Sequence, residues 1–435
     1  MTTTQSPGQG PAGAGADSAW SRNPSAAEPV LDIRDFSVVY RTPGGDVKAV
    51  ESVNLSLRPG EVVGLAGESG SGKSTLAYGA CRLLRAPALI TSGSVIYRGR
   101  RMPQAVDVVS QRPEQLRQLR WREIAIVFQS AMNALNPVLS VKAQLVDVIR
   151  AHMAVSRSQA VDKAAELLDF VSIPRSRLRS YPHELSGGMR QRVMIAMALA
   201  TDPEMVIMDE PTTALDVVVQ RDILAQVVEL KQRLGFAVLF ITHDLSLLLE
   251  LADRVAVMYA GRLIEVATGH QIHHEPAHPY TKGLLNSFPS LRGHKRELRG
   301  IPGIPPDLRA LPPGCPFLPR CGYGTESCLE VEMKLVPVAT SEDPNHVTAC
   351  PFVVPETPAP AHDVGRDVAG AAPQGSLPAG TGPGADGGAG ADGGASRSDG
   401  ASAGVAGASP GPGRVVQERD AGTKVDGATS GGERL

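Results

Sequence analysis

The segment at residues 62–84 reads VVGLAGESGSGKSTLAYGACRLL and carries three local signals in a row. It opens with a short apolar run, residues 62–66, of the kind found in buried strands. A glycine-rich stretch follows and ends in Lys-Ser-Thr at 73–75. The remaining residues, 76–84, favour a helix. Strand, glycine-rich loop and helix in this order form the context that a phosphate-binding loop requires, so the sequence predicts such a loop here.

The chemistry of a phosphate loop explains these residue types. Glycines let backbone N–H groups turn inward around phosphate oxygens, and the start of the following helix adds a partial positive charge. We expect Lys73 to reach the β- and γ-phosphates of a nucleotide and Ser74 to ligate Mg²⁺. A glycine-rich turn that binds nothing is the alternative, and the flanking strand and helix disfavour it. The predicted phosphate-binding residues are Gly67, Glu68, Ser69, Gly70, Ser71, Gly72, Lys73, Ser74 and Thr75.

A second apolar run ends in two acidic residues, because residues 205–210 read MVIMDE. Ligand-binding groups collect at the carboxyl ends of strands in an α/β sheet. We therefore expect Asp209 to hold Mg²⁺ through water and Glu210 to polarise the attacking water. An acidic pair can also simply end a strand, but the sequence PTTALD at 211–216 argues against that interpretation.

Another short motif, LSGGM at 185–189, directly precedes an apolar helical segment at 190–200. Ser186 and the two glycines are suited to the N-terminus of that helix, which makes a second anion site in the same chain. A single nucleotide does not need both sites. A plain Ser-Gly-Gly cap is the alternative, and the motifs around it disfavour that alternative.

These segments together resemble the ATP-binding subunits of ABC transporters. The resemblance implies a P-loop NTPase of ABC type, with an α/β RecA-like core, an antiparallel β subdomain and a helical subdomain. It implies that the signature residues contact an ATP held by another subunit, so that two subunits enclose two ATPs. These signature residues are Leu185, Ser186, Gly187, Gly188 and Met189.

The same resemblance assigns roles to four further residues. It implies that Gln129 is the Q-loop glutamine and shares in Mg²⁺ binding with Ser74 and Asp209. Asp216 matches the D-loop, and His243 matches the switch histidine that contacts the γ-phosphate. Tyr40 matches the aromatic residue that stacks on adenine, with Phe36 as a nearby alternative. The predicted catalytic residues are Glu210, His243, Lys73 and Gln129.

Three segments narrow the branch of the family: FQSAMNALNP at 128–137, HPYTKGLL at 278–285, and the stretch from 301 to GCPFLPRC at 314–321. They resemble the dipeptide, oligopeptide and nickel importer ATPases, although Ser130 stands where that branch often has an acidic residue. The resemblance implies that the chain energises uptake of dipeptides or oligopeptides. The same role in a nickel or oligosaccharide importer stays open.

Functions outside transport agree less well with this sequence. ABC ATPases of DNA repair or translation usually carry a long coiled coil or two nucleotide domains, and this chain has neither. A regulatory chain with a degenerate ATP site is disfavoured, because every catalytic position is filled. Within transport, the resemblance implies these partners: a second ABC ATPase subunit, most often a paralogue, two transmembrane permease subunits and, indirectly, an extracytoplasmic solute-binding protein.

Four of the five cysteines fall in one short stretch rich in proline, glycine and charge. Such a segment has little core of its own, and a metal site could order it. Four thiolates suit zinc or an iron–sulfur cluster, but the spacings lack the CxxC knuckle of most zinc ribbons. The resemblance points to a [4Fe–4S] cluster, while zinc and metal-free thiols stay open. The cysteines are Cys315, Cys321, Cys328 and Cys350.

Composition sets the remaining expectations. The chain has 435 residues and a formal net charge of −2, which does not predict a nucleic-acid surface. Its start lacks signal-peptide features, and no apolar run approaches the roughly 18 residues of a membrane span. We therefore expect a peripheral protein at the cytoplasmic face of the cell membrane, attached through its partners.

The predicted domain organisation follows from shifts in composition along the chain. Both ends are rich in Gly, Ala, Ser and Pro and cannot bury enough apolar surface to fold, so we expect disorder there. The helical subdomain is expected at about 130–185, and the C-terminal extension contains the four cysteines. The predicted boundaries are 1–28 for the N-terminal tail, 29–265 for the nucleotide-binding domain, 266–353 for the extension and 354–435 for the C-terminal tail.

Overall fold

The structure is a computed structural model, and it describes residues 28–102, 104–129, 134–213, 215–287 and 300–352. The two predicted tails lie outside the described residues, apart from Glu28. Part of the predicted Q-loop segment, residues 130–133, and Ala214 of the predicted D-loop also lie outside them.

A small antiparallel sheet opens the chain, with strand order β2-β1-β4-β5. β1 and β2 form a hairpin that turns at Pro43 and Gly44, and Thr42 pairs with Gly45 at its tip. The antiparallel β subdomain that the resemblance implies is therefore present. The strands are β1 (Leu31–Thr42), β2 (Gly45–Leu57), β4 (Ala88–Tyr97) and β5 (Val106–Asp107).

The larger sheet has the strand order β11-β12-β10-β9-β3-β8-β7-β6, and it is mixed. Its five strands from β9 to β6 run parallel, whereas β10, β12 and β11 pair antiparallel at the other end. The strands are β3 (Val62–Ala66), β6 (Ile124–Val127), β7 (Met205–Asp209), β8 (Ala237–Ile241), β9 (Arg254–Tyr259), β10 (Arg262–Thr268), β11 (Val336–Pro337) and β12 (Val347–Thr348).

The parallel strands explain why distant segments of sequence meet. Because β3, β6, β7 and β8 run in the same direction, their carboxyl ends lie along one edge of the sheet. The phosphate loop follows β3, Gln129 follows β6, Asp209 ends β7, and His243 follows β8. Sheet topology alone thus collects four predicted site segments at one edge.

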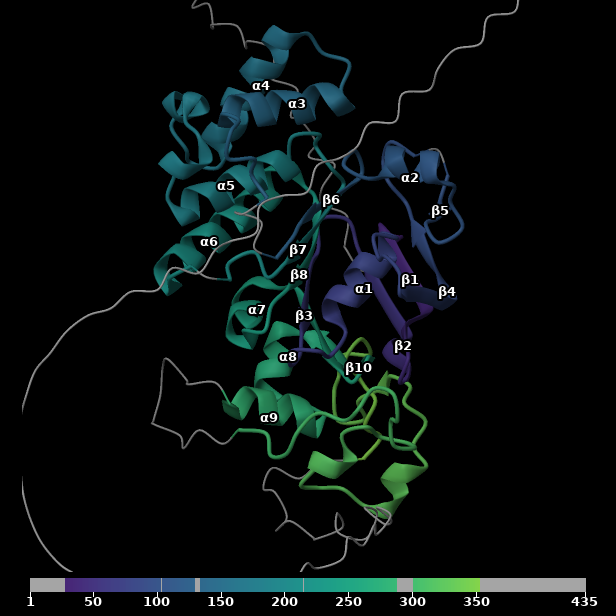
Figure 1. Cartoon of the computed structure of the whole chain (residues 1–435). Helices are drawn as coiled ribbons and strands as arrows, with labels where there is room; N and C mark the ends of the chain where they lie inside the picture. Colours follow the sequence, from purple (N-terminus) through teal and green to yellow (C-terminus); the bar gives the residue numbers. More distant parts are fainter. Residues whose placement is uncertain (1–27, 103, 130–133, 214, 288–299, 353–435) are drawn as a thin grey trace, which may run out of the picture. The chain divides into compact units, whose positions relative to one another are not determined.

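Helices α5 and α6 pack on one face of the parallel strands and α1 on the other, whereas α3 and α4 pack on α5, away from the sheet (Figure 1). Side-chain oxygens cap several of them, for example Ser140 before α3 and Ser156 before α4. The helices are α1 (Lys73–Ala80), α2 (Pro113–Leu119), α3 (Val141–His152), α4 (Arg157–Phe170), α5 (Gly187–Ala198), α6 (Val217–Leu234), α7 (Leu245–Leu251), α8 (Gly269–His274) and α9 (Pro279–Ser287), with 3₁₀ turns η3 (Arg175–Arg179), η4 (Pro182–Glu184), η5 (Leu318–Arg320) and η6 (Glu326–Leu329).

One predicted helix is shorter than the sequence suggested. The apolar run to residue 84 favoured a helix over 76–84, but α1 ends at Ala80. Cys81 closes the helix and Arg82 takes a left-handed backbone with φ 51°. The apolar side chains beyond that point continue the core without continuing the helix.

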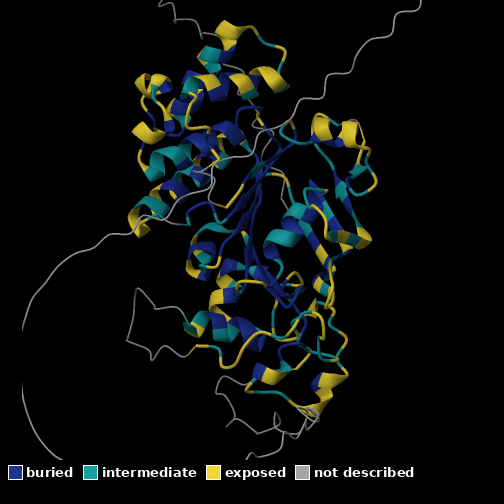
Figure 2. Cartoon of the chain, in the orientation of Figure 1, coloured by how far each residue is buried: buried dark blue, intermediate teal, exposed yellow. Residues whose placement is uncertain are grey.

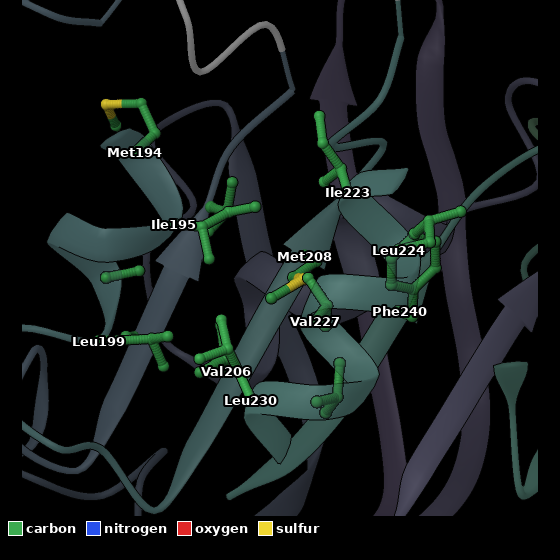
Figure 3. Close-up of a cluster of buried hydrophobic side chains, with 14 of the residues drawn as sticks. Met194, Ile195, Leu199, Val206, Met208, Ile223, Leu224, Val227, Leu230 and Phe240 are labelled. Atoms are coloured by element: carbon green, nitrogen blue, oxygen red, sulfur yellow. The ribbon is translucent and has the colours of Figure 1, made fainter. Parts of the chain in front are cut away.

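Two apolar clusters lie on opposite faces of the parallel strands, because neighbouring residues of a strand point to opposite sides. Met205 and Ile207 of β7 pack with α1 and the small antiparallel sheet, whereas Val206 and Met208 pack with α5 and α6. Figure 3 shows this second cluster, with Met208 and Phe240 facing Ile195, Ile223 and Val227. Figure 2 shows the central strands buried and the outer sides of the helices exposed.

The C-terminal extension is built onto the edge of the larger sheet. β12 pairs with β10, so the predicted boundary between 265 and 266 falls inside strand β10. Glu265 is fully buried there, where its carboxylate lies 3.0 Å from His346 Nε2 and accepts hydrogen bonds from the backbone of Ala277 and His278. A buried carboxylate needs such partners, so these contacts hold the extension against the core.

Among the described residues, none of the helices combines the length and the apolar character that a membrane-spanning segment needs.

Candidate active site

The phosphate loop connects the fully buried strand β3 to helix α1. Two of its glycines have no substitute. Gly67 has φ +147°, and a Cβ there would lie 2.2 Å from the carbonyl oxygen of Met258. Gly72 has φ +103°, and a Cβ there would lie 2.2 Å from the carbonyl oxygen of Ala49. The loop therefore passes against neighbouring backbone at a distance that only glycine permits.

Gly72 is also the N-cap of α1, and no side chain caps that helix. The first backbone N–H groups of a helix have no partner within the helix. At the end of a glycine-rich loop they make an anion site, strengthened by the helix dipole. The predicted strand-loop-helix context is therefore present.

Lys73 lies inside this loop and is only 6% exposed. Its Nζ donates hydrogen bonds to the carbonyl oxygens of Gly67 and Glu68, both at 2.8 Å. Burial lowers the pKa of Lys73, and the nearby carboxylates of Glu210, Asp209 and Glu68 oppose that shift. The Lys73 ammonium is thus fixed by two carbonyl groups of the phosphate loop.

Asp209 ends β7 and faces α1. Its two carboxylate oxygens accept hydrogen bonds from Ser74 Oγ at 3.0 Å and from the Tyr78 hydroxyl at 2.5 Å. Burial and the adjacent Asp209 raise the pKa of Tyr78, so that hydroxyl stays a donor. The structure therefore brings together Ser74 and Asp209, two of the three predicted Mg²⁺ ligands.

Glu210 is the centre of a second set of contacts. Its carboxylate accepts hydrogen bonds from Gln129 Nε2 at 2.8 Å and from Thr213 Oγ1 at 3.1 Å, and it lies 3.5 Å from His243 Nδ1. Its backbone takes a left-handed conformation with φ 44°, which is uncommon for a side chain of this kind and concentrates at functional sites. Gln129, Glu210 and His243, predicted from three separate segments, therefore meet.

Tyr40 lies on β1 with its hydroxyl 3.3 Å from that of Thr75, so it borders the phosphate loop. Phe36, the sequence-level alternative, is fully buried and packs beneath Gly79 of α1. A buried ring cannot stack on a ligand, which leaves Tyr40 as the candidate.

The signature residues lie at the start of α5. Ser186 Oγ accepts a hydrogen bond from the backbone of Met189 at 3.2 Å, and Ser186 is exposed while Leu185 is buried. Asp216 caps α6 in the same way through Val219, and the two valines that follow it, Val217 and Val218, are 68% and 70% exposed. Both helices therefore begin with an exposed capping residue, and α6 adds two exposed apolar side chains.

The four late cysteines line one cavity of about 280 Å³, together with the buried His278 and Phe317. All of them are free thiols. Burial raises the pKa of Cys315 to about 12 and that of Cys321 to about 11, which keeps both protonated. The donor set matches that of an iron–sulfur or zinc site.

The positions of these four thiols, in contrast, do not form a metal site. Among the residues that the structure describes, no group of three or more His, Cys, Asp or Glu side chains is placed so that it could hold a metal ion. The prediction that Cys315, Cys321, Cys328 and Cys350 form a [4Fe–4S] site is therefore not supported by the structure, although the convergence of the cysteines is real.

Comparison with known proteins identifies the family to which this chain belongs. The family described as "ABC transporter" matches residues 50–213, and the one described as "Oligopeptide/dipeptide transporter, C-terminal region" matches residues 264–328. A putative peptide import ATP-binding protein of Brucella melitensis is 44% identical over 74% of this chain and 97% of its own length. The chain belongs to the ABC transporter ATPases.

Two further relatives agree with this family. The oligopeptide transport ATP-binding protein OppD of Salmonella typhimurium is 44% identical over 70% of this chain and 90% of its own length. OppD of Escherichia coli is 44% identical over 69% of this chain and 88% of its own length. As a member of this family, the chain is an ATPase with the P-loop fold of ABC proteins, and membrane permeases are the partners that such an ATPase implies.

Sequence reasoning missed four side chains of this ABC ATPase. Tyr78 and Thr213 hold the two acidic residues, and Tyr280 and Arg320 of the extension reach the phosphate loop. Tyr78 lies one helical turn after Ser74, a spacing that places both on one face. Thr213 lies three residues after Glu210, within the segment already singled out. The contacts of Tyr280 and Arg320 with Glu68 join residues more than 200 positions apart and leave no local signal.

Proposed function

We propose that this ABC ATPase hydrolyses ATP to energise the uptake of dipeptides or oligopeptides across the cytoplasmic membrane. The observation that carries the proposal is that one chain contains both the side chains that meet around Asp209 and Glu210 and the oligopeptide/dipeptide transporter C-terminal region at 264–328. The names of its relatives, peptide import and oligopeptide transport ATP-binding proteins, support the same cargo class.

The chemistry follows from the contacts around β7. Lys73 and the N–H groups at the start of α1 bind the β- and γ-phosphates, while Tyr40 stacks on adenine. Mg²⁺, held by Ser74, Gln129 and Asp209, would neutralise charge on the phosphate oxygens. Glu210 orients the attacking water, and His243 steadies the γ-phosphate. Such preorganised charges and dipoles supply most of the rate enhancement in phosphoryl transfer.

The second half of the site comes from another polypeptide in this proposal. Leu185 to Met189 and Asp216 lie at two helix starts whose capping residues, Ser186 and Asp216, are exposed, so that they can meet an ATP held by a facing subunit. That subunit is a second ABC ATPase, most often a paralogue in this branch. Two permease subunits receive the motion in the membrane, and a solute-binding protein delivers cargo to them from outside.

The test is a pull-down from detergent-solubilised membranes with the full chain as bait and mass spectrometry of what is retained. The proposal expects two polytopic subunits, a second ABC ATPase and a peptide-binding protein. Recovery of a nickel- or oligosaccharide-binding protein would change the cargo but keep the transport role. Recovery of soluble DNA-repair or ribosomal factors alone would refute transport.

A [4Fe–4S] cluster in the extension is a separate and finer part of the proposal. The four thiols that line one cavity support it, whereas their present arrangement does not form a metal site, so cluster binding would require the cysteine-bearing loops to draw together. Protein purified anaerobically should then be brown and contain about four irons per chain, as a [4Fe–4S] cluster requires. Colourless protein without iron would reject the cluster.

A further inference from the structure

All three polar groups of one phosphate-loop residue, Glu68, are held by partners. Its carbonyl oxygen accepts a hydrogen bond from Lys73 Nζ at 2.8 Å. Its backbone N–H donates to the hydroxyl of Tyr280, also at 2.8 Å. Its carboxylate pairs with both terminal nitrogens of Arg320, at 2.7 and 3.0 Å. Two of these three partners come from the C-terminal extension, more than 200 positions away in sequence.

The Arg320 side chain is built into its position. It is only 4% exposed, and its Nε donates to the carbonyl oxygen of Pro302 at 2.8 Å. The guanidinium also lies over the rings of Tyr259 and Phe317, 5.8 and 5.9 Å from their centroids. A planar guanidinium fixed on several sides loses little further freedom when it forms a two-pronged pair with a carboxylate.

Tyr280 is equally fixed. It packs against Tyr259 at 4.6 Å and against Phe317 at 5.4 Å between ring centroids, and Tyr259 and Phe317 lie 5.3 Å apart. All three rings are almost completely buried. The Tyr280 hydroxyl therefore reaches the backbone of Glu68 from a rigid aromatic trio, defined here as Tyr259, Tyr280 and Phe317.

We infer that Arg320 and Tyr280 are positioning residues for ATP binding, which fix the phosphate loop in its nucleotide-accepting form from the C-terminal extension. The inference rests on the ATP site and is independent of the cargo proposed above. A loop that is already ordered does not lose conformational freedom when phosphate binds, so affinity rises without any new contact to the nucleotide. The position of the Lys73 ammonium depends directly on both positioning residues, because all three side chains form hydrogen bonds with Glu68.

A consequence links the two halves of the chain. Arg320 directly precedes Cys321, which lines the cysteine cavity. The order of the cysteine-bearing segment therefore sets how firmly Arg320 is held, and through Glu68 it sets the affinity for ATP. The plainer alternative is that the ion pair only attaches the extension to the core and has no effect on nucleotide.

The experiment measures MgATP affinity by calorimetry, and ATPase KM and kcat, on the purified full chain. Arg320→Met keeps the alkyl stem and removes the charge, and Glu68→Gln removes the same pair from the other side. Each should raise Kd and KM by about tenfold, the size expected from one lost charge-assisted interaction, with kcat within about twofold. Arg320→Lys should recover part of the loss.

Two comparisons separate positioning from simple attachment. Arg309→Ala removes an exposed ion pair with Asp307 in the same extension and should leave Kd unchanged. Tyr280→Phe keeps the aromatic trio, removes the hydroxyl that Glu68 uses, and should raise Kd. Wild-type Kd and KM in Arg320→Met, Glu68→Gln and Tyr280→Phe, with or without lower thermal stability, would overturn the inference. A wild-type chain that binds no nucleotide would instead refute the ATPase itself.

Discussion

At the scale of single residues, the site is organised around two neighbouring carboxylates with different surroundings. Asp209 is 1% exposed and is held by Ser74 and Tyr78. Glu210 is 19% exposed at its side chain and is held by Gln129 and Thr213 beside His243. The buried Asp209 is suited to binding a metal ion and the more accessible Glu210 to orienting water, and these are the roles that we propose for them.

Glu210→Gln tests this division. The amide keeps the shape and the hydrogen bonds but cannot polarise water, so ATP should still bind while hydrolysis falls by about 100-fold or more, the contribution typical of a positioned general base. Phosphate release and nucleotide binding measured on the same preparation check it. Turnover near that of the wild type would remove Glu210 from the role.

Lys73→Ala tests whether the phosphate loop binds ATP. Lys73 Nζ is fixed by two loop carbonyls and carries the charge that would meet the β- and γ-phosphates. A hydrogen bond to a charged group contributes about 1.5–3 kcal/mol, so ATP affinity should fall by about tenfold to 100-fold. Equilibrium binding of a fluorescent ATP analogue measures this, and unchanged affinity would contradict the assignment.

At the scale of elements, the sequence predicted the parts that obey local rules. The strands at 62–66 and 205–209 and the helix that follows the signature motif come from short apolar runs with clear flanking residues, and the structure has them. Sheet order could not be predicted in this way, because strand pairing depends on contacts between residues far apart in sequence.

The same limit applies to the extension. Its cysteine spacing drew attention to metal binding, whereas the structure shows that two short strands and a buried Glu265–His346 pair attach it to the sheet. Short strands and a single buried acid leave almost no periodic pattern, so sequence reasoning had no means of finding them. Arg320, the residue that reaches the phosphate loop, likewise appeared only as a neighbour of Cys321.

A prediction at this scale concerns Gly72, where the phosphate loop joins helix α1. Gly72→Ala would place a Cβ 2.2 Å from the Ala49 carbonyl oxygen, so α1 or β2 must shift and ATP binding should be lost together with several kcal/mol of stability, as for other strained backbones and overpacked sites. Denaturant unfolding and nucleotide binding measure the two effects.

Gly45→Ala is the matched control, because Gly45 has a similar φ of +112° but nothing within 4 Å of the added Cβ. It should lose about 1–2 kcal/mol from backbone strain alone and keep its ATP affinity. Equal effects of the two substitutions would show that strain, and not contact with the Ala49 backbone, governs the loop.

At the scale of the whole molecule, the distribution of exposed apolar side chains agrees with a subunit that works within an assembly. Phe128, Val138 and Leu139, which flank the Q-loop and lie before α3, are 43%, 75% and 43% exposed. We call them the Q-loop patch. Val217 and Val218 form a separate exposed pair beside the D-loop. Exposed apolar side chains can mark a surface that binds a partner, so we expect the proposed permease at the Q-loop patch and the proposed second ATPase at the valine pair.

The final prediction concerns the Q-loop patch and its membrane partner. Gln129 donates a hydrogen bond to Glu210 at the start of this segment, so only one side chain would separate a permease bound at the patch from the carboxylate that we propose to be catalytic. Val138→Asp should leave ATP affinity of the isolated chain unchanged, because Val138 is a surface residue outside the phosphate site. It should greatly reduce recovery of permease subunits from membranes, since burying an unpaired carboxylate in an interface is strongly unfavourable.

Ile304→Asp, at an 85% exposed position in the extension, is the control and should retain the permease. Quantitative mass spectrometry of pull-downs from the two variants measures the difference. If both retain the permease equally, the membrane subunit docks elsewhere, and the Gln129–Glu210 contact then serves catalysis without reporting on transport. If both lose it, the extension also faces the permease, and its contact with Glu68 would give the membrane subunit a second route to the phosphate loop.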